Sequence, residues 1–66
     1  MPAEEDGDRL ATLVHALRTP LTIVEGFADA LSRRGAEMSE EERAEYLERI
    51  GEAAREMRDL LDGVRR

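Results

Sequence analysis

The sequence contains no cysteine, so neither disulfide bonds nor a thiolate metal site can stabilise the fold. It has one histidine, which by itself cannot hold a structural zinc ion. A chain of 66 residues also buries little apolar surface when it folds alone. Oligomerisation is the remaining source of stability, so we expect the chain to associate.

Aromatic residues and prolines are scarce as well. Aromatics make up 3% of the chain, two residues are proline, and 39% are charged, a composition that favours solvated helices and predicts an all-α fold. The net charge of -6 disfavours nucleic acid as a partner, because binding to phosphates needs clustered positive charge. No apolar run approaches the roughly 20 residues needed to span a bilayer, and the acidic beginning is unlike a signal peptide. We therefore expect a soluble, cytoplasmic domain without membrane contact.

Apolar residues recur in alternating steps of four and three along two segments, starting at Leu10 and Leu47. This heptad rhythm predicts two helices, at about 8–34 and about 39–65, joined by a turn at about 35–38 and paired antiparallel as a hairpin. The predicted seam consists of Leu10, Val14, Leu17, Leu21, Val24, Ala28 and Leu31 on the first helix and Leu47, Ile50, Ala54, Met57, Leu61 and Val64 on the second.

The ends of both helices carry recognisable signals. Gly35 suits a left-handed residue that ends the first helix, and Ser39 with Glu42 is typical of a capping box that opens the second. Residues 1–7 are acidic and lack periodicity, so we interpret them as a lead-in to the domain. Asp8 is then a candidate N-cap for the first helix.

A second apolar row widens each stripe, because further apolar residues repeat every seven positions. Three apolar positions per heptad suit a helix that touches two neighbours, as in a four-helix bundle. We therefore predict a homodimer of two hairpins. Glu40 to Glu42 we interpret as solvated charges that complement a helix N-terminus, not as a metal site. The second row consists of Leu13, Pro20 and Phe27 on the first helix and Tyr46, Ala53 and Leu60 on the second.

His15 is the candidate for chemistry. At about 100° per residue it lies on the order of 150° from the centre of the apolar stripe, so it should face solvent. An exposed imidazole is substantially neutral at pH 7 and can act as a nucleophile, although most surface histidines have no such role. Pro20 follows five residues later inside the helix, at a cost of about 3 kcal/mol. A kink there would loosen the backbone beside the histidine, while the alternative is a tolerated core proline on the second row.

The string His15-Ala16-Leu17-Arg18-Thr19-Pro20-Leu21-Thr22 resembles the H-box of sensor histidine kinases, commonly H-E-L-R-T-P-L-T. The run from Ile23 to Leu31, with Gly26 before Phe27, is similar to the same family, and the resemblance extends from Leu10 to the end of the chain. The resemblance implies that His15 is the phosphoacceptor of a dimerisation and histidine-phosphotransfer domain. It also implies a four-helix bundle and transfer of the phosphoryl group to an aspartate of a response-regulator receiver domain.

One position departs from this pattern. The family usually has Glu or Asp directly after the histidine, where this chain has Ala16. The acid is expected to accept a hydrogen bond from one ring nitrogen, which makes the other nitrogen a better nucleophile toward ATP. Its loss should therefore weaken autophosphorylation. Thr19, on the same exposed face as His15, matches the family residue that positions water for phosphatase chemistry.

The chain has no glycine-rich nucleotide loop, and its length leaves no room for an ATP-binding domain. We expect no cofactor in this chain, with ATP and Mg bound on a separate catalytic domain that is a partner of the module. We therefore expect the chain to be an excised module of a sensor kinase, with a linker beginning after Arg66. The kinase could be a membrane-bound sensor of which this module is a cytoplasmic part. Two alternatives stay open: a stand-alone relay phosphotransferase that works without ATP, and a degenerate dimerisation bundle without catalysis.

Overall fold

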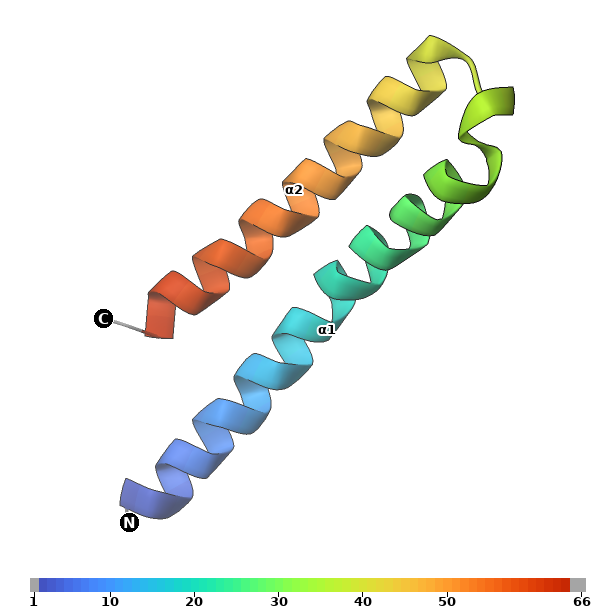
Figure 1. The fold of residues 1–66 in the computed structure, drawn as a ribbon. Coiled ribbons are helices and arrows are strands. Elements are labelled where there is room, and N and C mark those ends of the chain that lie inside the picture. Colours follow the sequence, from blue (N-terminus) through green and yellow to red (C-terminus); the bar gives the residue numbers. More distant parts are fainter. Residues whose placement is uncertain (1, 65–66) are drawn as a thin grey trace.

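Two long helices joined by a short turn form an antiparallel hairpin (Figure 1). The computed structural model describes the backbone of residues 2–64 and the side chains of residues 7–63. Helix α1 spans Pro2–Arg34, the single 3-10 turn η1 spans Gly35–Glu37, and α2 spans Glu40–Val64. The predicted all-α hairpin is confirmed.

The hairpin is one helix layer thick, with extents of 54 × 19 × 10 Å along its principal axes. A layer this thin leaves almost every side chain partly open to solvent. Within the described residues, only Pro20, Met38 and Ala53 are buried. A single hairpin therefore lacks an enclosed core, which is the physical reason to expect a partner.

Helix α1 begins at Pro2, so residues 2–7, expected as a lead-in, are helical. The prediction of Asp8 as an N-cap is wrong, because Asp8 lies well inside the helix. Proline suits a first helical position, since its missing N–H would have no partner there. The lack of apolar periodicity before Leu10 therefore does not indicate an unwound segment.

The turn differs from the prediction at Gly35, which does not adopt a left-handed conformation; none of the described residues has a positive φ. The carbonyls of the turn find other partners. The Met38 N–H donates to the Gly35 carbonyl over 3.2 Å. The Arg43 guanidinium, reaching back from α2, donates through Nη1 to the Gly35 carbonyl at 2.8 Å and the Met38 carbonyl at 2.7 Å. Arg43 thus supplies hydrogen bonds that hold the turn between the two helices.

The start of α2 is the capping box that the sequence predicts. The Glu42 N–H donates to the Ser39 Oγ over 3.1 Å, and the Ser39 N–H donates to Glu42 Oε1 over 3.2 Å. Glu40, Glu41 and Glu42 occupy the first turn, where negative charge complements the helix dipole.

The packing between the helices follows the second apolar row more closely than the predicted seam. Pro20 and Ala53 are buried, and the rings of Phe27 and Tyr46 meet edge to face with centroids 4.8 Å apart. Leu13 and Leu60 are half-buried in the same row. Five of the large seam residues instead stay exposed, so the prediction that the seam pairs the two helices is wrong for them. These five are Leu10 (62% exposed), Val14 (44%), Leu21 (45%), Leu47 (58%) and Leu61 (49%).

The five exposed residues form one apolar stripe along one side of the hairpin. Val14, Leu21, Leu47 and Leu61 each follow a second-row position by one residue, which rotates them by about 100° around their helices. Leu10 stands four residues, about one turn, before Val14. Because the helices are antiparallel, the same rotation turns both sets of side chains toward the same side. We call this surface the leucine stripe; it consists of Leu10, Val14, Leu21, Leu47 and Leu61.

Candidate functional site

The candidate site lies on α1, in the half of the helix that leads to Pro20. His15 is exposed, as its position relative to the apolar rows predicts. The turns on either side present hydroxyl groups, since Thr12 and Thr19 stand three residues before and four residues after it and are exposed as well. The imidazole is therefore open to a large reactant, and Arg18, three residues after it and also exposed, places a positive charge on the same face.

Pro20 lies just over one turn beyond His15, and α1 continues through it to Arg34. Its side chain is less than 2% exposed and is the largest fully buried side chain of the described residues. Both interpretations of this proline thus have a physical basis. The ring packs between the helices, and its missing N–H removes a hydrogen bond to the Ala16 carbonyl, next to the histidine.

A second feature of the backbone follows directly after the proline. The Thr22 hydroxyl donates to the Arg18 carbonyl over 2.9 Å. Hydrogen bonds of this kind, from a threonine to the carbonyl four residues earlier, tend to bend helices. The stretch between His15 and Thr22 therefore combines a missing backbone bond with an additional side-chain bond.

Ala16, where the resemblance expects an acid, is half-buried. It lines a shallow hollow at the edge of the helix pair, together with Leu13 and Leu60. Position 16 is therefore only partly open to solvent, because it borders the same hollow as Leu60 of α2.

An apolar groove further along the hairpin was not anticipated from the sequence. It lies where α1 approaches α2, on the C-terminal side of His15. Ile23, 39% exposed, is its most exposed large apolar side chain. Ile23 belongs to neither predicted apolar row. An isoleucine outside both rows was the feature of the sequence that could have indicated this groove. A Cβ at Gly26 would meet nothing within 4 Å, so the groove is open there. Its lining residues are Thr22, Ile23, Gly26, Phe27, Ala30 and Tyr46.

The part of the chain that the structure describes holds no helix that is long and apolar enough to cross a membrane. Within the same residues, no group of three histidine, cysteine or carboxylate side chains is arranged to hold a metal ion.

A helical hairpin with an exposed histidine ahead of a buried proline, and an apolar stripe left open for a partner, has the features of a phosphoacceptor domain. The family model described as His Kinase A (phospho-acceptor) domain matches residues 6–66. The chain therefore belongs to the His Kinase A family, whose members have a phosphoacceptor and dimerisation role in histidine kinases and typically form homodimers. Comparisons with curated proteins and with solved structures give no match.

Proposed function

We propose that His15 accepts a phosphoryl group from ATP, bound on a separate catalytic domain, and passes it to an aspartate of a response-regulator receiver domain in the cytoplasm. The observation that carries this proposal is the exposure of His15 next to Pro20 on a hairpin of this family. Thr19, exposed one turn after His15, is a candidate for positioning water when the module acts in reverse on the phosphorylated regulator.

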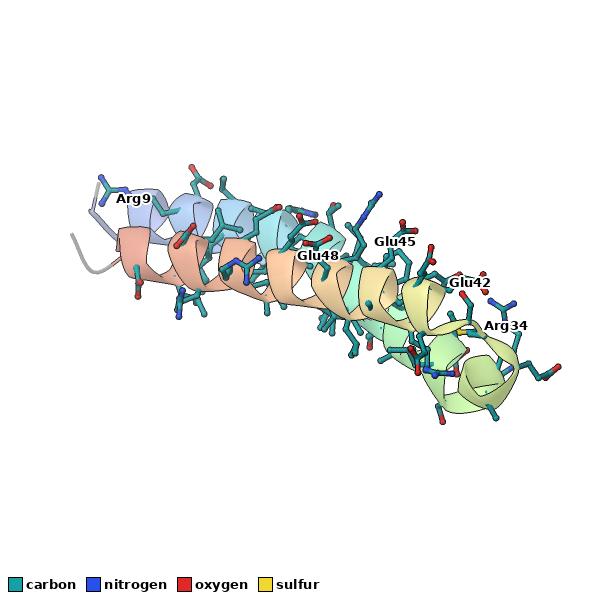
Figure 2. All side chains as sticks on the ribbon, turned by 90° about the horizontal axis from the view of Figure 1, so that it is seen from above. Arg9, Arg34, Glu42, Glu45 and Glu48 are labelled. Carbon is teal, nitrogen blue, oxygen red and sulfur yellow. The ribbon has the colours of Figure 1, made fainter. Side chains whose placement is uncertain are left out.

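The leucine stripe is proposed to pair two hairpins into a four-helix bundle. The opposite side of α2 cannot serve this purpose, because it carries negative charge: Figure 2 shows Glu42, Glu45 and Glu48 projecting on one side of that helix. Glu45 precedes Leu47 by two residues, about 200° around the helix. Burying apolar side chains stabilises the dimer, whereas burying unpaired carboxylates would destabilise it.

The apolar groove is proposed as the docking surface for the receiver domain. It lies along α1 on the C-terminal side of His15, so a domain bound there would bring an acceptor aspartate alongside the imidazole. Ile23 supplies an exposed apolar anchor, and Gly26 allows the backbone of a partner to approach α1 closely. Neither residue contributes to the leucine stripe, so the docked receiver and the second hairpin would not compete for one surface.

A two-stage labelling experiment tests this function. The chain is incubated with a histidine-kinase catalytic domain, Mg²⁺ and ATP labelled at the γ-phosphate, and the receiver domain is then added. We expect label first on the chain and then on the receiver. Label that never enters the chain, from either ATP or a phosphorylated receiver, would contradict the proposal.

A relay phosphotransferase is the second candidate, and Ala16 is the observation that favours it. Without the family acid, attack on ATP is expected to be slow, whereas transfer between His15 and an aspartate depends mostly on the regulator. Label that enters the chain from a phosphorylated receiver but not from ATP would identify this second function.

A further inference from the structure

The structure places two side chains on the His15 side of α1 that can do indirectly what the missing acid would do. Because α1 begins at Pro2, Asp8 lies inside a continuous helix and not at its end. Asp8, Thr12 and His15 are separated by four and three residues, the spacings at which helical side chains stand one above another. All three are exposed.

The direction of side chains in a helix decides which neighbours can meet. They lean toward the helix N-terminus, so each residue covers the turn before its own Cα. The imidazole of His15 therefore lies over Ala11 and Thr12, of which Thr12 alone has a polar side chain. By the same rule Thr12 leans toward Asp8, and both line the hollow beside Ala16.

We propose that Thr12 is a positioning residue for His15: its hydroxyl accepts a hydrogen bond from the Nδ1–H of the imidazole and donates one to the carboxylate of Asp8. This inference rests on the proposed function of His15. The bond to Thr12 keeps the proton on Nδ1 and leaves the Nε2 lone pair free, since the tautomer of a histidine is set by the hydrogen bond of its other nitrogen.

The chemical step then balances without another catalyst in this chain. The Nε2 lone pair attacks the γ-phosphorus of ATP, the bond to the β,γ-bridging oxygen breaks, and ADP leaves with that electron pair. The ring keeps its Nδ1 proton and gains a positive charge, which the Asp8 carboxylate stabilises through the Thr12 hydroxyl. The proton passes to water once the phosphoryl group is in place.

Nitrogen NMR of the imidazole in the whole chain tests the arrangement independently of any phosphorylation. Thr12→Val, which keeps the shape but removes the hydroxyl, is expected to shift the ring from Nδ1–H toward the Nε2–H tautomer. Thr12→Ser should retain the parent tautomer, and Asp8→Asn should shift it partly. Ala11→Val, a β-branched change one residue away, serves as the matched control and should leave it unchanged.

The same variants are then phosphorylated with a catalytic domain and ATP. Loss of one hydrogen bond predicts an initial rate about fivefold lower for Thr12→Val, with Thr12→Ser close to the parent. An unchanged tautomer in Thr12→Val would overturn the inference, and so would a shifted tautomer with an unchanged rate. If the parent takes up no phosphate at all, the proposed function fails, while the NMR result still decides whether Thr12 positions the ring.

Discussion

Replacing Leu47 by alanine should weaken the dimer without disturbing the contact between the two helices of one hairpin. Leu47 is 58% exposed in the hairpin, and the substitution removes three carbons. At about 0.8 kcal/mol per buried carbon, full burial of these carbons is worth roughly 2.4 kcal/mol. The share that is still exposed in the hairpin, roughly 1.4 kcal/mol, is gained on dimerisation. A symmetric dimer contains the site twice, so we expect a loss of about 3 kcal/mol and a Kd about 100-fold higher.

Sedimentation equilibrium over a range of concentrations measures this Kd, with circular dichroism to follow helicity. Ile23→Ala is the matched control, because Ile23 is an exposed aliphatic residue of similar size, 39% exposed, that lies outside the leucine stripe. Helicity lost on dilution together with dimer mass also agrees with the reasoning, since folding and association are coupled in small dimers. A parent chain that is monomeric at micromolar concentration with full helicity would refute it, as would equal effects of the two substitutions.

Three further substitutions test other parts of the structure. Ala16→Glu should raise the initial rate of His15 phosphorylation by a catalytic domain at least about tenfold and change transfer to the receiver little; equal rates would show that the missing acid is not limiting. Pro20→Ala should restore about 3 kcal/mol of helix stability and lose two buried ring carbons at about 0.8 kcal/mol each, for a net rise in Tm of about 8 °C in thermal unfolding. A lower Tm would show that packing by Pro20 dominates. Arg43→Ala should lower the free energy of unfolding by about 2 kcal/mol in urea titrations, because two charge-assisted hydrogen bonds to the turn are lost. The control Arg49→Ala, at an exposed position on the same helix, should change the free energy of unfolding by less than about 0.5 kcal/mol.

The features that the sequence predicts correctly are set by local rules. Helix type follows from the period of the apolar residues, the start of α2 from the reciprocal spacing of Ser39 and Glu42, and the exposure of His15 from its angle to the apolar rows. None of these depends on knowing how the two helices are rotated against each other.

The features that could not be predicted depend on that rotation or on contacts distant in sequence. Two adjacent apolar rows were available for pairing, and the choice falls on the one with Pro20, Ala53 and the Phe27–Tyr46 contact. Gly35 was assigned a left-handed conformation because its carbonyl partner, Arg43, lies eight residues away. The partial burial of Ala16 beside Leu60 could not be predicted for the same reason, since it follows from the row that α1 presents to α2.

The most direct test of the account is the chemical identity of the phosphate bound to the chain. After incubation with a catalytic domain, Mg²⁺ and ATP, or with a phosphorylated receiver, the chain is tested for phosphate that is lost in acid and stable in base. We expect one such phosphate per chain, located on His15 by fragmentation mass spectrometry and absent from a His15→Gln variant that keeps its helicity. Phosphate that persists in that variant, or a folded parent that takes up none from either donor, would contradict it.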